Sequence, residues 1–365
     1  MARIAYLAPV FSPAVGGGVA YVSILARELP TRGACARFTI ITERHPGAPV
    51  KEASADGSLE ILRIFPFRAG RSTRGFASYL AYALQNAQFL RLLRVLPAKG
   101  VLFVHGSFFN NPTLLSVALR SIRKARPGLR LVLDLRDPKF PGSVVKKAAS
   151  FDATISCSKN ISERLSGVSN VWEIPVMIEG RFFTQAEQKA ALEKYGLHGK
   201  LFIFNGSGFN KGKGSDVLIR LAREIRASGR DVGLVVAGKR RFWNADLQDA
   251  HQEGWLMPLG IIPSIDVRLL ASLAWLDANL STVDSFPRHS LEALASGARV
   301  LLPQGVPEFA DVCPEHVVTQ EEGGALAARA IAIAEGAIGA CRYPWEKHLP
   351  DVVIAQYMAL IDSLI

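Results

Sequence analysis

The sequence twice repeats one local order: an apolar run, a glycine-rich loop and then a helical pattern. Near the start, Ile4–Val10 precedes three glycines and the helical pattern 19–29. The order returns where Leu201–Asn205 runs into Gly206–Gly214 and a helical pattern at 217–225. Because strands that alternate with helices form parallel sheets, the repeats predict an α/β protein. A glycine loop between strand and helix also lets backbone N–H groups approach a phosphate closely.

The length sets the expected number of domains. A chain of 365 residues is too long for one ordinary core and suits two domains, since a typical domain has ~150 residues. Apolar residues make up 49% of the sequence and charged residues 21%, which is typical of a folded globular protein. We therefore predict two α/β domains.

The basic residues are concentrated in the first half. Residues 1–177 carry a net charge of +14, whereas residues 178–365 carry −3. No acid lies between Glu60 and Asp134. This acid-free stretch holds an amphipathic helical pattern at 76–90, preceded by three arginines, Arg68, Arg71 and Arg74. The pattern fits a helix packed on its own sheet or a basic element at an anionic membrane surface, and both alternatives stay open.

The cysteines and the first residues bear on the compartment. Cys35, Cys157, Cys313 and Cys341 lack the spacing of a metal site, which favours a reduced, cytoplasmic setting. The opening residues read as a first strand and not as a signal peptide, because prolines soon interrupt the apolar run. No apolar run reaches the ~18 residues of a membrane span.

The stretch 281–309 is the richest in chemistry. It follows an apolar run, Leu273–Leu280, that predicts a buried strand, and it leads into a short helix at 290–295 that should end at Gly297. An acid lies on each side of the turn, Asp284 before the helix and Glu292 within it. Helix N–H groups could hold a phosphate while the two carboxylates hold hydroxyls. An ordinary strand–loop–helix with acids near a helix start is the open alternative.

The run Asp284–Gly297, DSFPRHSLEALASG, resembles the E-x7-E motif of family 4 retaining glycosyltransferases of the GT-B fold. Asp284 stands for the first glutamate, and Arg288 and His289 stand where a small polar and an aliphatic residue are usual. The resemblance implies two Rossmann-like domains that face each other across a cleft, with a C-terminal helix crossing back to the first domain. It also implies that the second domain binds a nucleotide-sugar and the first binds the acceptor.

The second glycine loop carries two lysines, Lys211 and Lys213, that can neutralise a diphosphate. The segment 206–216 resembles the R-x4-K-G-x-D motif of the same family, with Gly212 as one extra residue. The resemblance implies that both lysines stabilise the leaving diphosphate. A basic surface loop is the alternative.

Two further segments resemble the family in the first half. Gly17 and Gly18 lie at its N-terminal glycine loop, and Arg136 with Asp137 lies at a strand end that faces the donor sugar in the family. A bare turn and a salt-bridged pair capping the sheet are the respective alternatives.

The resemblance, carried over residue by residue, assigns a catalytic set and a donor-binding set. The catalytic residues are Asp284, Lys211, Lys213, Arg136 and Asp137. The donor-binding residues are Gly17, Gly18, Ser207, Gly208, Gly238, Gly260, Ile261, Phe286, Pro287, Arg288, His289 and Glu292.

The segment 174–183 resembles the family's interdomain linker, which divides the chain into an acceptor domain (1–177), a nucleotide-sugar domain (178–344) and a returning helix (345–365). The predicted function is retaining transfer of a sugar from a UDP- or GDP-linked donor to a glycan or lipid-linked acceptor of the bacterial envelope. We expect no metal and no cofactor, and a cytoplasmic protein with peripheral membrane contact. A non-catalytic nucleotide-sugar binder and a nucleic-acid-binding protein are the alternatives; the basic residues match no nucleic-acid motif.

Overall fold

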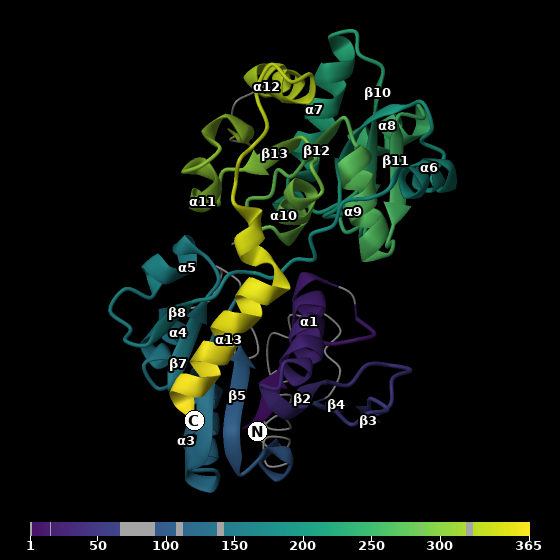
Figure 1. Cartoon of the computed structure of the whole chain (residues 1–365). Coiled ribbons are helices and arrows are strands. Elements are labelled where there is room, and N and C mark those ends of the chain that lie inside the picture. Colours follow the sequence, from purple (N-terminus) through teal and green to yellow (C-terminus); the bar gives the residue numbers. More distant parts are fainter. Residues whose placement is uncertain are drawn as a thin grey trace. The chain divides into compact units, whose positions relative to one another are not determined.

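The structure is a computed structural model that describes residues 2–14, 16–65, 92–106, 112–136, 142–284, 286–318 and 324–365. The chain forms two compact units (Figure 1). The first consists of Met1–Met177 together with Pro350–Ile365, and the second is Ile178–Leu349. The predicted amphipathic pattern at 76–90 lies outside the described residues.

The first unit is built on a sheet of order β3-β4-β2-β1-β5-β6-β7-β8. All neighbouring strands are parallel except β3 and β4, which are antiparallel. The strands are β1 (Ala2–Leu7), β2 (Cys35–Glu43), β3 (Lys51–Ala53), β4 (Leu59–Phe65), β5 (Lys99–His105), β6 (Gly128–Leu135), β7 (Ala153–Ser156) and β8 (Val171–Glu173). The helices are α1 (Gly17–Thr31), α3 (Pro112–Ala125), α4 (Gly142–Ala148), α5 (Lys159–Arg164) and α13 (Pro350–Leu364).

Both faces of this sheet are apolar, as a covered parallel sheet requires. Side chains alternate along β1, so Ile4 and Tyr6 join one core while Ala5 and Leu7 join the other. Helices α1 and α13 supply the first core, and α3 contributes to the second.

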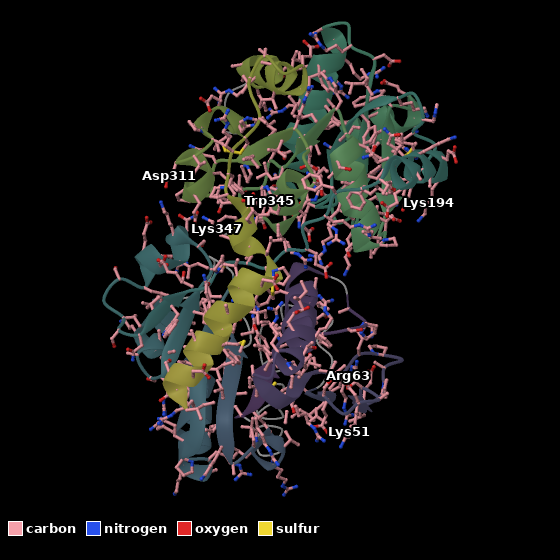
Figure 2. The ribbon with its side chains drawn as sticks, viewed as in Figure 1. Lys51, Arg63, Lys194, Asp311, Trp345 and Lys347 are labelled. Carbon is pink, nitrogen blue, oxygen red and sulfur yellow. A yellow bond between two sulfur atoms is a disulfide. The ribbon has the colours of Figure 1, made fainter. Side chains whose placement is uncertain are left out.

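A buried arginine forms hydrogen bonds at one edge of the sheet. Arg63, in β4, exposes only 2% of its side chain and lies near Lys51 of β3 in Figure 2. Its guanidinium donates to the carbonyl oxygens of Pro49 at 2.9 Å and Ser12 at 2.8 Å, and to the carboxylate of Glu52 at 3.0 Å. These bonds join the edge strands to the segment that follows β1.

The second unit has a fully parallel sheet of order β11-β10-β9-β12-β13-β14. Its strands are β9 (Leu201–Asn205), β10 (Val232–Ala237), β11 (Leu256–Gly260), β12 (Leu276–Ala278), β13 (Val300–Pro303) and β14 (Val317–Val318). Its α-helices are α6 (Gln185–Lys194), α7 (Ser215–Ala227), α8 (Ala245–Gln252), α9 (Ser264–Leu273), α10 (Arg288–Ala295), α11 (Pro307–Ala310) and α12 (Gly324–Ala334). The 3-10 helices are η2 (Lys211–Lys213), η3 (Pro314–His316) and η4 (Trp345–His348).

Two predicted boundaries near the richest stretch differ from the structure. The predicted strand Leu273–Leu280 is too long, because Leu273 ends α9 and β12 covers only Leu276–Ala278. The predicted helix begins two residues earlier than expected, at Arg288. It stops as predicted before Gly297, whose φ of +78° suits a glycine after a helix end.

The chain returns to the first unit through α13, which confirms the predicted contact of the C-terminal helix with the first domain. This helix begins at Pro350, and the preceding Trp345–His348 forms η4 within the second unit. Its apolar face is buried in the same core as α1 through Val353, Ile354, Tyr357, Leu360 and Ile361. An ion pair between Arg32 and Asp351 closes one end of the contact.

Two cysteines depart from the reduced state that the sequence suggests. Cys313 and Cys341 form a disulfide, while Cys35 and Cys157 are free and buried. Within the described ranges, no helix is long and apolar enough to cross a membrane.

Candidate active site

In the second unit the paired strands β9 and β12 each carry a buried asparagine at the carboxyl end. Asn205 is the last residue of β9, and Asn279 directly follows β12. Nδ2 of Asn205 donates to the carbonyl oxygen of Ala278 at 2.6 Å, and its Oδ1 accepts from the N–H of Ser207 at 2.9 Å. Nδ2 of Asn279 donates to Oγ of Ser290 at 3.0 Å. The two amides therefore fix the loop after β9 and the first turn of α10.

Two of the predicted glycines allow loops to touch. A Cβ on Gly208, where φ is +73°, would lie 2.6 Å from the carbonyl oxygen of Lys239. A Cβ on Gly238 would lie 2.8 Å from the Cα of Gly208. Any side chain at either position would collide with backbone, so these glycines let the loop after β9 pack on the end of β10. Ser207, another predicted donor contact, is half-buried in this loop.

The two predicted motifs of the second unit meet in one ion pair. Lys213 and Asp284, separated by 71 residues, pair through Nζ and Oδ1. The carbonyl oxygen of Gly212 accepts from the N–H of Thr282 at 3.1 Å, which holds the two loops together. The side chains of the pair remain 25% and 19% exposed. Lys211 is exposed and forms no ion pair with any residue that the structure describes, so its charge is not neutralised.

Helix α10 begins with two basic residues where helices usually carry acids. Arg288 and His289 are its first residues, Pro287 precedes it without a side-chain cap, and its first turn holds no acid. The unpaired N–H groups and the helix dipole already make this end positive. Arg288 and His289 each face an acid, Glu292 and Asp277, so the free N–H groups are what suits the start of α10 to an anion.

Four buried atoms around this helix end make no hydrogen bond to another described residue. They are Oδ1 of Asp277, Nε of Arg288, Nδ1 of His289 and Oε1 of Glu292. Oε1 of Glu292 does lie 2.8 Å from Nη2 of Arg288, in an ion pair that lacks hydrogen-bond geometry. Because buried polar groups nearly always have partners, these atoms are available to a bound ligand or to ordered water.

Asp277 was missed by the sequence reasoning. It is fully buried in β12, and its Oδ2 lies 2.7 Å from Nε2 of His289. Burial disfavours the imidazolium, but the charge and hydrogen bond of Asp277, with contributions from Glu292 and Asp284, raise the pKa of His289 above its ordinary value. The signal that could have identified Asp277 is a charged residue inside an apolar run, where it needs a partner.

Phe286 and Pro287, predicted donor contacts, are buried. The ring centroid of Phe286 lies 5.2 Å from that of Phe309 and 5.0 Å from that of His348. These contacts anchor the loop that carries Asp284 on an aromatic cluster, and direct contact with a donor stays a prediction.

The ends of β10 and β11 are joined as well. The N–H of Gly238 donates to the carbonyl oxygen of Gly260 at 2.6 Å. The next residue, Ile261, exposes 55% of its surface and is available to a flat apolar group. Its predicted place beside the nucleotide base stays a prediction.

Arg136, predicted to face the donor, is instead buried inside the first unit. Its Nε donates to Oδ1 of Asp134 at 2.6 Å, and its guanidinium lies 4.1 Å from the ring centre of Tyr21. Its N–H groups reach one carboxylate, two carbonyls and two hydroxyls, those of Asp134, Ile174, Pro175, Tyr21 and Tyr357. These contacts give Arg136 a structural role in the first unit; Asp137 lies outside the described residues, and a contact of either residue with a donor stays a prediction.

The remaining predicted residues lie at the start of α1. Gly17 opens this helix and Gly18 follows, both are exposed, and open space surrounds the positions where a Cβ would stand. The predicted contact of Gly17 and Gly18 with a donor stays a prediction.

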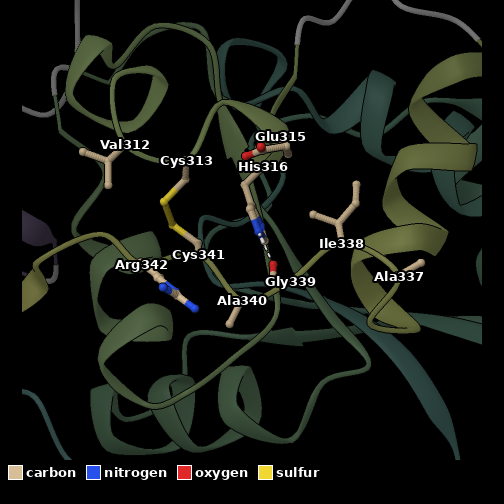
Figure 3. A pocket seen from close by; sticks show the side chains of 10 residues that line it. All are labelled: Val312, Cys313, Glu315, His316, Ala337, Ile338, Gly339, Ala340, Cys341 and Arg342. Atoms are coloured by element: carbon tan, nitrogen blue, oxygen red, sulfur yellow. Dashed lines mark hydrogen bonds between the residues drawn. A yellow bond between two sulfur atoms is a disulfide. The ribbon is translucent and has the colours of Figure 1, made fainter.

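A separate cavity of about 450 Å³ lies beside the disulfide in the second unit (Figure 3). His316, which lines it, is held by two carbonyl oxygens, with Nδ1 2.8 Å from that of Val300 and Nε2 2.8 Å from that of Gly339. No predicted site residue lines this cavity, so it is distinct from the candidate site.

Comparisons with known proteins concern the fold. No protein-family profile matches the sequence, and no curated protein matches it either. The solved structure of Anabaena HepE in complex with UDP and glucose is similar with a TM-score of 0.70 and 16% identity, over 100% of both chains. The α,α-trehalose-phosphate synthase (UDP-forming) from Burkholderia xenovorans, in complex with glucose-6-phosphate, gives 0.70 and 12% over 99% of both chains. Sucrose-phosphate synthase from Thermosynechococcus elongatus gives 0.68 and 17%, over 100% of this chain and 96% of that chain.

These likenesses extend along the whole chain, although few residues are identical. They confirm the predicted α/β class with two Rossmann-like units, as in the GT-B fold.

Proposed function

We propose that the protein is a glycosyltransferase that takes a sugar from a nucleotide-sugar donor. The observation that carries this proposal is the ion pair of Lys213 and Asp284, which joins the glycine loop to the loop before α10, a helix whose first turns hold buried polar atoms without a hydrogen bond to another described residue. A UDP-linked donor is supported by HepE, which was solved with UDP and glucose, and by the UDP-forming synthase.

The two lysines would act on the leaving group. Departure of a nucleoside diphosphate builds negative charge on its phosphates, and cations fixed nearby lower that barrier. Lys211 has an unneutralised charge and Lys213 needs only to exchange its carboxylate partner for a phosphate. Because side chains and helix N–H groups supply the positive charge, we expect transfer to continue after chelation of metals by EDTA.

The two acids would bind hydroxyls. Glu292 is buried with one oxygen that makes no hydrogen bond to a described residue, and a ribose hydroxyl would supply the missing donor. Asp284, released from Lys213, would accept hydroxyls of the transferred sugar. Its side chain is one methylene shorter than the glutamate of the motif it resembles.

The finer proposal follows the motif resemblance. We place the protein among the family 4 enzymes, which retain the anomeric configuration, and we propose a glycan or lipid-linked acceptor in envelope synthesis. The net charge of +14 in residues 1–177 favours an anionic partner for that half, such as an anionic membrane surface.

A thermal-shift screen with UDP-glucose, GDP-mannose and ADP-glucose tests donor binding. A ligand at 100 times its Kd stabilises the folded state by about 2.7 kcal/mol, so the correct donor should raise the melting temperature clearly. Lys213→Ala should reduce this gain, whereas Lys200→Ala, at an exposed lysine of the same unit, should not. Stabilisation by none of a wide panel of donors would remove the proposal.

Catalysis needs a second measurement, because a non-catalytic binder would share the same donor site. Release of nucleoside diphosphate from the stabilising donor, with and without candidate glycan and lipid-linked acceptors, separates the two functions. Binding without release under every acceptor condition would favour the non-catalytic reading.

A further inference from the structure

The pair of Asp277 and His289 contacts Gly206, the first residue of the loop that carries both lysines. Nε2 of His289 faces two groups, Oδ2 of Asp277 at 2.7 Å and the backbone N–H of Gly206 at 3.2 Å. A protonated Nε2 donates to the carboxylate, whereas an unprotonated Nε2 accepts from Gly206. The protonation state of Nε2 therefore decides whether His289 of α10 forms its hydrogen bond with β12 or with the loop after β9.

The ring of His289 also packs against the first residue of this loop and leaves no room for a side chain there. A Cβ on Gly206 would lie 2.6 Å from both Cε1 and Nδ1 of the ring. On the other side the ring meets Phe204 edge-on, with centroids 5.7 Å apart. The loop can start where it does only because residue 206 has no side chain, so His289 fixes its first residue.

The surroundings favour a charged ring. The carboxylates that act on His289 are Asp277 from β12, Glu292 from α10 itself and Asp284 from the preceding loop. Lys213 and Arg288 each already face a carboxylate, and Gly206 brings no charge from the β9 side. A cation in the first turn of a helix opposes the helix dipole, a cost that the carboxylate of Asp277 offsets in part.

An anion would compensate for it. The side chain of His289 is nine-tenths buried, and its Nδ1 makes no hydrogen bond to any residue the structure describes. Resting on the proposed function, we propose that His289 is a positioning residue for the donor diphosphate: held as an imidazolium by Asp277, it adds positive charge at the start of α10, while its ring, packed against Gly206, fixes the first residue of the lysine loop.

The proposal predicts a specific pH dependence of donor affinity. Since the pKa of His289 is raised by its carboxylate neighbours, the imidazolium is present at low pH and is lost as pH rises through that raised pKa. Donor affinity should fall over the same range. A nucleotide-sugar is a good probe because its diphosphate is esterified at both ends and keeps its charge from about pH 6 to about pH 9.

The experiment measures the Kd of the stabilising nucleotide-sugar, UDP-glucose first, by calorimetry over that pH range. In the wild-type protein the plot of Kd against pH should show an inflection at the pKa of His289. His289→Gln should bind the donor about fivefold more weakly than wild type at the acidic end, the effect of one charge at a helix terminus, and its plot should lack this inflection. Asp277→Asn should move the inflection to lower pH, because it removes the charge that favours the imidazolium. Thermal melts of each variant without donor report whether it folds.

A second readout needs no variant at the site. The imidazole signal of His289, followed by NMR in the wild-type protein, should titrate at higher pH with UDP-glucose bound, because binding and protonation are linked. An unshifted titration, or an inflection in Kd that persists in His289→Gln, would overturn the inference while leaving the proposed function intact. Failure of every nucleotide-sugar to bind would overturn both.

Discussion

Two pairs of a basic and an acidic side chain, Arg136 with Asp134 in the first unit and Lys213 with Asp284 in the second, differ in how completely their hydrogen bonds are satisfied. In the first unit Arg136 and Asp134 are almost inaccessible, at 9% and 0% exposure, and the guanidinium donates to Asp134 and to four other oxygen groups of the same unit. In the second unit Lys213 and Asp284 are 25% and 19% exposed, and four buried atoms at the neighbouring helix end make no hydrogen bond to another residue that the structure describes.

The difference agrees with a structural role for Arg136 and Asp134 and with the binding role that we propose for Lys213 and Asp284. A buried charge is tolerated in a stable core only when its hydrogen bonds are complete, which is the condition of Arg136. A pair that must exchange partners during binding has to remain accessible and incompletely bonded, which is the condition of Lys213 and Asp284. The sequence places both pairs next to apparent strand ends, and only the hydrogen-bond partners distinguish them.

The largest effect should follow from breaking the structural pair. Asp134→Asn leaves the buried Arg136 without its carboxylate and should lower the free energy of unfolding by about 3–5 kcal/mol. Asp246→Asn, which breaks the exposed pair with Arg223, should cost no more than about 1 kcal/mol. Urea denaturation of both variants checks the comparison, and equal losses would show that burial does not distinguish these pairs.

A smaller effect, on rate instead of stability, should follow from changes at the functional site. Lys213→Ala and Lys211→Ala should each lower turnover at least about tenfold, equivalent to ~1.4 kcal/mol in the barrier, because each removes a charge from the leaving diphosphate. Their unfolding curves should stay near wild type, and Lys200→Ala should keep both rate and stability. Normal initial rates in both lysine variants would exclude them from the mechanism.

The smallest expected effect of a single substitution is on binding to an anionic membrane surface. Every cationic contact with an anionic vesicle contributes about 1 kcal/mol, so replacing Arg68, Arg71 and Arg74 by Gln should weaken binding stepwise, and salt should weaken it further. The matched control is Lys239, Arg240 and Arg241, an exposed basic run in the second unit, whose replacement by Gln should leave sedimentation with vesicles unchanged. No binding to anionic vesicles at low salt would assign the basic half to another anionic partner.

The parts of the fold that local patterns specify could be predicted. The strand Leu201–Asn205, the glycine loop after it and the helix stop before Gly297 are as expected, because periodicity, glycine positions and helix-end chemistry act over a few residues. The boundary at Leu273 was wrong because a continuous apolar run does not distinguish the end of a buried helix from a short strand.

What depends on distant contacts could not be predicted from the sequence. The resemblance gave Lys213 and Asp284 separate roles, and their pairing required the folded chain. So did the Asp134 partner of Arg136, the inward turn of Phe286 and the disulfide of Cys313 with Cys341. Each is decided by which elements the topology brings together. Asp277 and His289 lie 12 residues apart and became a pair only once β12 and α10 were in place.

The return of α13 to the first unit has a consequence for how the protein is made. The second unit is continuous in the chain, whereas the first needs Val353, Ile354 and Tyr357 to complete its core. At about 5–20 residues per second, a ribosome needs roughly 10–30 s to synthesise the stretch between Met177 and Pro350. During that time the core around Tyr21 and Phe103 lacks α13, so the second unit can fold before the first is complete, and the synthesis of α13 becomes the step that completes the core of the first unit.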